Sequence, residues 1–251
     1  MKKLNGWWVI DTENDNGLSN WSPAEWQNHM AEFTVEYFLP DKDKRRTCID
    51  IGGNVGQMAI GLSPYFKEVR TFEPCPPFYE CLNSNLKEFN VTNTISYNTG
   101  LSDKPSSLYY KMKYDRCGTS RFMKEEEIEK GHHLVKSNKN FEFKTLDVNT
   151  LDSYNFQDVD LIKIDVEGWE PHVLAGGLKT IKTWRPIVVA EWHNKIEILE
   201  EIFNPLDYVL SYKRRSDFYY VPKENVQWIM KNLFNGHPQA SHYAFWKLLG
   251  I

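Results

Sequence analysis

The chain has 251 residues, with 30 Lys and Arg against 34 Asp and Glu for a net charge of −4. This length fits one well-buried α/β domain better than two. There is no basic block that could grip a phosphate backbone, which argues against a nucleic-acid partner. No apolar run is long enough to cross a membrane, so we expect a soluble, cytoplasmic protein. The four cysteines lack zinc-type spacing and read as reduced, structural thiols.

The first 45 residues are rich in tryptophan, and we interpret them as a cap on a catalytic core of residues 46–251. Ser22, Pro23 and Glu25 form a capping box, which predicts a helix from Pro23 to about Phe38. Its apolar face would dock on the sheet or over the cofactor cleft. The tryptophans of this segment could stack on a sugar, although packing is the favoured interpretation. They are Trp7, Trp8, Trp21 and Trp26.

The central stretch, residues 48–62, reads as an apolar strand, a turn with three glycines and a helix that begins at Gln57. Such a unit binds a ligand at the helix N-terminus, where glycines let the backbone come close. The turn lacks the first glycine of the dinucleotide pattern, because Ile51 stands in its place. The residue pattern therefore predicts a nucleotide-type cofactor but not a standard dinucleotide site.

Two acids refine this prediction. Asp50 would repel a pyrophosphate, whereas it would attract the ammonium group of S-adenosylmethionine. Glu73, after a predicted strand at 69–72, would bind the ribose hydroxyls of either cofactor. Because of Asp50, we favour S-adenosylmethionine over a nicotinamide cofactor. The candidate cofactor-binding residues of this region are Asp50, Gly52, Gly53, Asn54, Gly56, Gln57 and Glu73.

Further along, residues 76–89 read as a helix and residues 94–99 as a third strand. Leu101 and Ser102 follow at its carboxyl end, where adenine would sit. Residues 107–112 and 141–146 read as added antiparallel strands on either side of a long charged loop, which we interpret as a lid or a mobile insertion.

Residues 159–168 read as a buried parallel strand that ends in the carboxylates Asp165 and Glu167. A strand at 186–190 leads into Glu191 and His193, which point to one face because strand side chains alternate. Ligands of open α/β sheets bind outside the carboxyl ends of the strands. Asp165, Glu191 and His193 are therefore the catalytic candidates.

The remaining pattern predicts four more elements. A helix should run from Glu170 to Trp184, in which Gly176 and Gly177 indicate close contact of the helix with the sheet. The others are a helix at 196–203, an antiparallel hairpin of 208–212 and 218–221, and a helix at 226–234.

Six blocks resemble the FkbM-type S-adenosylmethionine methyltransferases, with matching order and spacing from about Thr47 to His193. They are residues 50–56, 72–74, 101–103, 145–147, 161–168 and 173–177. The resemblance implies a class I methyltransferase (Rossmann-like) fold, with a seven-stranded, mostly parallel sheet, helices on both faces and an antiparallel edge hairpin. It also implies methyl transfer to an oxygen, often of a sugar or polyketide hydroxyl, and adds Pro74 to the cofactor residues.

A hydroxyl acceptor must lose a proton, and Asp165, Glu191 and His193 are the candidates for the base. An unperturbed imidazole such as that of His193 is nearest to neutral pH. A divalent cation held by Asp165, Glu191 and His193 is the less favoured alternative. The acceptor would be a small molecule or a glycan. The rival functions are a non-catalytic carbohydrate-binding protein and a nicotinamide-dependent oxidoreductase.

Overall fold

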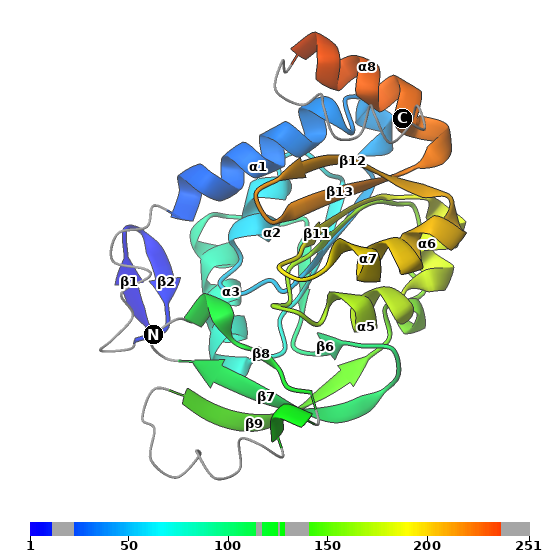
Figure 1. Cartoon of the computed structure of the whole chain (residues 1–251). Coiled ribbons are helices and arrows are strands. Elements are labelled where there is room, and N and C mark those ends of the chain that lie inside the picture. The colour runs from blue at the N-terminus through cyan, green and yellow to red at the C-terminus, as the bar shows by residue number, and fades with distance from the viewer. Residues whose placement is uncertain (12–22, 114–116, 125, 129–140, 237–251) are drawn as a thin grey trace.

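The computed structural model describes residues 1–11, 23–113, 117–124, 126–128 and 141–236 (Figure 1). The predicted capping box cannot be compared with the structure, because Ser22 and the side chain of Glu25 lie outside the described residues. The same holds for Trp21 and the side chain of Trp26. Within it, no helix has the length and apolar character needed to cross a membrane.

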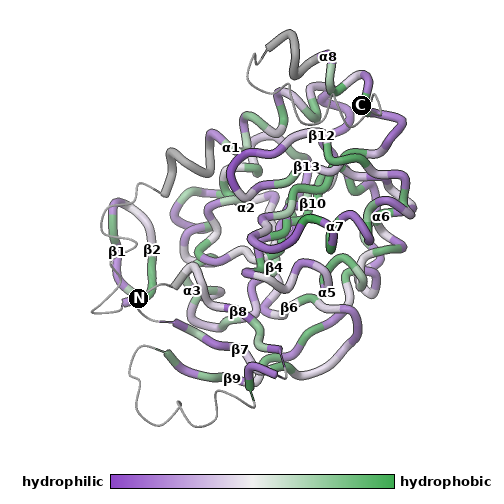
Figure 2. Tube along the Cα trace, in the orientation of Figure 1, coloured by the Kyte–Doolittle hydropathy of each residue, from purple (hydrophilic) through white to green (hydrophobic). Residues whose placement is uncertain are grey.

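The centre of the molecule is a seven-stranded sheet with strand order β12-β13-β11-β10-β3-β4-β5. Strands β11, β10, β3, β4 and β5 pair in parallel, and β13 runs antiparallel between β11 and β12. Figure 2 shows hydrophobic residues concentrated on central strands such as β10 and β13. The strands are β3 (Thr47–Ile51), β4 (Glu68–Phe72), β5 (Thr94–Tyr97), β10 (Val159–Ile164), β11 (Ile187–Glu191), β12 (Tyr208–Arg214) and β13 (Asp217–Pro222).

Helices cover both faces of this sheet, as expected for an α/β fold. One face, with Cys48, Leu161 and Val189, packs in one core with residues of α1 (Pro23–Tyr37), α2 (Gln57–Leu62) and α8 (Val226–Gly236). The other face, with Ile49, Ile162 and Val188, packs against the remaining helices. These are α3 (Pro76–Glu88), α5 (Glu170–Ala175), α6 (Leu178–Trp184) and α7 (Ile196–Phe203).

A second sheet lies below the first in Figure 1, with the strand order β6-β9-β7-β8. The two predicted added strands are present as β7 (Ser106–Lys113) and β9 (Phe141–Asn149), which pair antiparallel. The sequence did not show that β6 (Gly100–Leu101) and β8 (Arg121–Phe122) join them. Much of the intervening charged loop lies outside the described residues.

The N-terminus forms a short hairpin of β1 (Lys2–Leu4) and β2 (Trp7–Val9) beside α3. Trp7 is buried against Phe89, with ring centroids 4.5 Å apart, which agrees with the packing interpretation. The amide of Asn85 receives a hydrogen bond from Trp8 N at 2.7 Å and donates to Trp8 O at 2.9 Å and to Val55 O at 2.8 Å. The hairpin is thereby tied to the glycine turn.

One predicted helix is wrong in extent, because residues 170–184 form two helices that are separated at Gly176 and Gly177. A Cβ on Gly176 would lie 2.0 Å from the backbone oxygen of Ser102. The close approach is therefore to the segment after β6 and not to the central sheet.

Candidate active site

The turn after β3 is held by the neighbouring strand. The amides of Gly52 and Gly53 both donate to Phe72 O, at 3.0 and 2.8 Å. Gly52 has φ +93°, and a Cβ there would lie 1.8 Å from the backbone oxygen of Asp165. Only glycine fits this position, because both the conformation and the space exclude a side chain. The turn therefore touches the end of β10.

Glu73 joins the turn to the end of β4. One carboxylate oxygen accepts from Asn54 N and the other from Cys75 N, both at 2.8 Å. The residue is 4% exposed. Burial raises the pKa of Glu73 to about 8, although the two backbone donors oppose the shift.

Asp50 lies on β3 with its side chain on the face that α1 and α2 cover. It is 1% exposed, and its Oδ2 accepts a hydrogen bond of 2.9 Å from Thr71 Oγ1. Burial raises the pKa of Asp50 to about 6, while Thr71 and the ammonium of Lys163 lower it. At neutral pH most of this carboxyl group is ionised.

The other predicted cofactor residues differ in their surroundings. Gln57 is buried at the start of α2, and its side-chain Nε2 is among the few buried polar atoms of the described residues with no partner. Pro74 is half-buried directly after Glu73. Leu101 is packed in the core, and Ser102 Oγ binds Asp103 and receives the indole N–H of Trp169.

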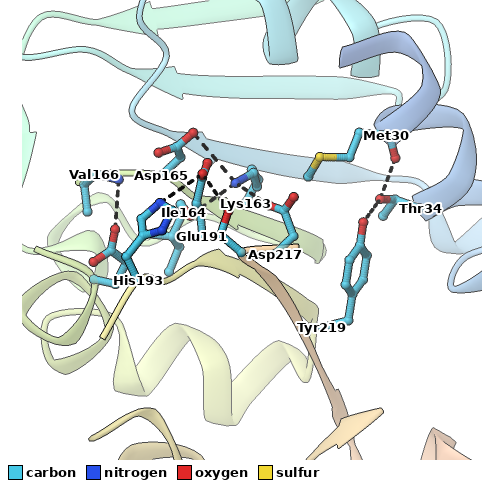
Figure 3. A network of polar contacts seen from close by, with 12 residues as sticks. Met30, Thr34, Lys163, Ile164, Asp165, Val166, Glu191, His193, Asp217 and Tyr219 are labelled. Atoms are coloured by element: carbon cyan, nitrogen blue, oxygen red, sulfur yellow. Dashed lines mark hydrogen bonds and ion pairs between the residues drawn. The ribbon is translucent and has the colours of Figure 1, made fainter. Parts of the chain in front are cut away.

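The three catalytic candidates lie close together where β10 and β11 end (Figure 3). Nε2 of His193 is 3.3 Å from Oε1 of Glu191, which also accepts a hydrogen bond of 2.9 Å from Ser216 Oγ. The side chain of His193 is 60% exposed, whereas those of Asp165 and Glu191 are about one-third exposed. The imidazole therefore forms the open side of the group.

Asp165 and Glu191 differ in how readily they ionise. Burial and the neighbouring Glu191 raise the pKa of Asp165 well above its usual range. Burial also opposes ionisation of Glu191, but the hydrogen bond from Asp165 lowers the pKa of Glu191 below its ordinary value. Asp165 is thus protonated, and Glu191 is the anion that faces His193.

Glu170 shapes the loop that carries Asp165. It is fully buried, and its Oε1 accepts from the amides of Val166 and Gly168, each at 3.2 Å. This leaves Glu167 half-buried with φ +55°.

Two charged residues of this site were not predicted from the sequence. Lys163 and Asp217 are both buried, and Nζ of Lys163 is 3.2 Å from Oδ1 of Asp217 and 4.0 Å from Oδ2 of Asp165. A lysine within an apolar strand was a usable signal, since lysine is almost never buried unless it is paired. Asp217 gave no signal, because its place depends on the pairing of β13 with β11.

The metal alternative gains no support from the arrangement of these groups. Within the part of the chain that is described, no group of three or more His, Cys, Asp or Glu is placed to hold a metal ion. The Lys163 ammonium lies among the carboxylates instead.

The family profile described as the methyltransferase FkbM domain matches residues 50–215, which include the predicted cofactor and catalytic residues and end just before Ser216 and Asp217. The chain belongs to the FkbM methyltransferase family. FkbM methyltransferases use S-adenosylmethionine, and the predicted family is thereby confirmed.

Two relatives illustrate how far the similarity extends. Methyltransferase 1 of Beauveria bassiana is 26% identical over 141 residues, which are 51% of this chain and 57% of that protein. The crystal structure of an FkbM methyltransferase from Methylobacillus flagellatus superposes with a TM-score of 0.51 and 15% identity, over 75% of this chain and 47% of that one. This chain thus spans about half the length of either relative, and the structural likeness shows that the α/β fold is shared.

Proposed function

We propose that this FkbM-family chain is an S-adenosylmethionine-dependent O-methyltransferase that methylates a hydroxyl group of a small molecule or glycan, with a sugar as the preferred acceptor. The observation that carries the proposal is the His193–Glu191 pair, a proton acceptor beside the turn that holds Asp50 and Glu73. The contact of Gly52 with the backbone of Asp165 joins these two parts of the site. The antiparallel β13 within a mostly parallel seven-stranded sheet further supports the class I arrangement.

The residues of the turn fit the cofactor. Asp50 supplies a buried anion for the ammonium, Glu73 has carboxyl-oxygen lone pairs for ribose hydroxyls in either protonation state, and Gln57 has an unpartnered buried amide that needs an acceptor. When bound, S-adenosylmethionine supplies a methyl group activated by its sulfonium.

The chain's own residues account for the proton. Glu191 holds His193 through Nε2, which leaves Nδ1 to accept the proton of an acceptor hydroxyl. As the imidazole becomes charged, the anion of Glu191 stabilises it, while the raised pKa of Asp165 keeps that group protonated. Ser216 fixes the position of Glu191.

Calorimetric titration with S-adenosylhomocysteine, beside NADH, tests the cofactor. We expect micromolar binding of S-adenosylhomocysteine that is lost in the double variant Asp50→Ala, Glu73→Ala. The matched control is Glu197→Ala, Glu201→Ala, which removes two exposed acids from α7. Binding of NADH instead would favour the oxidoreductase, and failure of the folded protein to bind either compound would favour the carbohydrate-binding module.

A screen of hydroxylated sugars then tests the acceptor. The measurement is formation of S-adenosylhomocysteine from S-adenosylmethionine with each sugar. Turnover with amines or thiols but with no hydroxyl compound would contradict transfer to oxygen.

A further inference from the structure

Lys163 is the one ammonium group in this network of polar contacts (Figure 3). It is 4% exposed, and its Nζ donates to Asp217 Oδ1 at 3.2 Å and to Ile164 O at 3.4 Å. Burial alone would lower the pKa of Lys163, but Asp165, Asp217 and Glu191 raise it, so the amine stays charged. A buried charge of this kind is retained only where several opposite charges compensate it.

The strand register places this charge between the two parts of the site. Lys163 on β10 is paired with Asp50 on β3, and Asp50 is paired with Thr71 on β4. Partners in a parallel pair point to the same face, so the three side chains form a row. On the other side, Asp217 pairs with Glu191 and binds the Lys163 ammonium.

We propose that Lys163 is a positioning residue that acts on both parts of the site: its buried ammonium holds Asp50 in the carboxylate form that receives the cofactor, and it keeps the acids next to His193 in place. The roles of Asp50 and His193 in this inference rest on the proposed function. The effect of Lys163 on the pKa of Asp50 can be measured without any ligand. Asp165 and Asp217 are its contacts on the acceptor side.

The groups that face Asp50 determine the sign of the effect. Lys163 lies beside it on β10, Thr71 donates to it from β4, and the carboxyl of Glu73 and the thiol of Cys48 interact with it electrostatically. The helix α2 on this face contains no ionisable side chain. Loss of the Lys163 charge must therefore raise the pKa of Asp50, and loss of a negative charge near Lys163 must lower it.

Carbon-13 NMR of labelled aspartate carboxyl groups measures this in the free protein, with the Asp50 signal assigned from Asp50→Asn. We expect the Asp50 titration midpoint to rise by about one pH unit or more in Lys163→Met and to fall in Asp217→Asn. Lys182→Met, an exposed lysine of α6, is the matched control and should leave the midpoint unchanged. If Lys163→Met does not fold, the fall in the nearly isosteric Asp217→Asn decides the question alone.

An unchanged Asp50 midpoint in the folded Lys163 and Asp217 variants would overturn the proposal. A shift in the same direction in both would overturn it too, because it would indicate a general loosening of the site and not a charge effect.

Calorimetry with S-adenosylhomocysteine, which keeps the amino-acid ammonium, adds the functional readout. With the pKa of Asp50 raised from about 6 to about 7, Lys163→Met should bind about fivefold more weakly than wild type at pH 6 and recover nearly all of the loss at pH 8.5, because Asp50 ionises again. A loss of equal size at both pH values would contradict the proposal, since a packing defect would not depend on pH. If wild type does not bind S-adenosylhomocysteine, the proposed function fails, and the NMR midpoints still decide the role of Lys163.

Discussion

At the scale of single residues, the site is defined by acids whose ionisation the fold changes. The carboxyl groups of Asp50 and Glu73 are both buried. Asp50 accepts a hydrogen bond from Thr71, and Glu73 accepts one from each of two backbone amides. Asp165 and Glu191 differ in ionisation although both are carboxylic acids at neighbouring strand ends. The different environments of these two carboxyl groups therefore favour the protonated form of Asp165 and the ionised form of Glu191.

Glu73 makes a testable contribution to stability. Its folded pKa of about 8 is raised above the ordinary value of 4.5, so the stability it contributes is complete below pH 4.5 and is lost as pH rises to about 8. In this interval the free energy of unfolding should fall by up to about 1.4 kcal/mol per pH unit. Glu73→Gln should remove that dependence in urea unfolding at pH 5, 6, 7 and 8. Parallel curves for wild type and variant would show that Glu73 does not titrate in this range.

His193 can be tested once a sugar acceptor is known. His193→Ala should lower kcat by about 10² to 10⁴-fold, because the variant lacks the base. Its affinity for S-adenosylhomocysteine should not change, since the imidazole is largely exposed and lies outside the glycine turn. Steady-state kinetics beside calorimetry separate the two effects, and an unchanged kcat would exclude His193 as the base.

At the scale of elements, the glycine turn and the β10 loop form one unit. Gly52→Ala should destabilise the protein by about 3 kcal/mol or more, because the new Cβ meets the Asp165 backbone and φ is positive. Gly118→Ala is the matched control, since nothing lies within 4 Å of a Cβ there. It should change the free energy of unfolding by less than about 0.5 kcal/mol. Equal urea midpoints for the two variants would contradict this explanation.

Local patterns predicted most elements of the central sheet, because each strand there is a short apolar run bounded by turn residues or charges. They failed where the cause lies far along the chain. The helix break at Gly176 results from the contact with Ser102, and Asp217 joins the site only through its pairing with Glu191. In contrast, Asp50 and Glu73 could be predicted as site residues, because a strand, a glycine turn and a helix follow one another along the chain there.

At the scale of the whole molecule, the N-terminal segment joins the body at two separate places. The hairpin β1–β2 lies against α3, and α1 packs with α2 and α8 on the opposite face of the sheet. The sequence suggested a cap of residues 1–45 but could not show this division, because the hairpin is attached through Asn85, a polar residue within a helix.

Asn85→Asp tests whether the hairpin supports the turn. The variant keeps the acceptor for Trp8 N but loses the donors to Trp8 O and Val55 O. We expect a loss of about 2 to 4 kcal/mol in unfolding free energy, faster hydrogen exchange in residues 7–9, and weaker binding of S-adenosylhomocysteine. Asn83→Asp, on the same helix, serves as the control, because Asn83 hydrogen-bonds to Tyr79 O and Ser96 Oγ and not to the hairpin or the turn in the described structure. Unaltered exchange in residues 7–9 would show that Asn85 does not hold the hairpin.

The contact between Gly52 and Asp165 has a consequence for how such a protein can acquire new substrates. With no room for even a methyl group between Gly52 and the Asp165 backbone, gradual substitution at this contact cannot change the spacing of the proposed methyl-donor and proton-accepting sides. Adaptation to acceptors of different size has to come from parts around this fixed pair. The second sheet is one of them, because Tyr110 on β7 interacts electrostatically with Glu73 and Glu167. Libraries for altered specificity should therefore vary β7 and β8 and leave the turn intact.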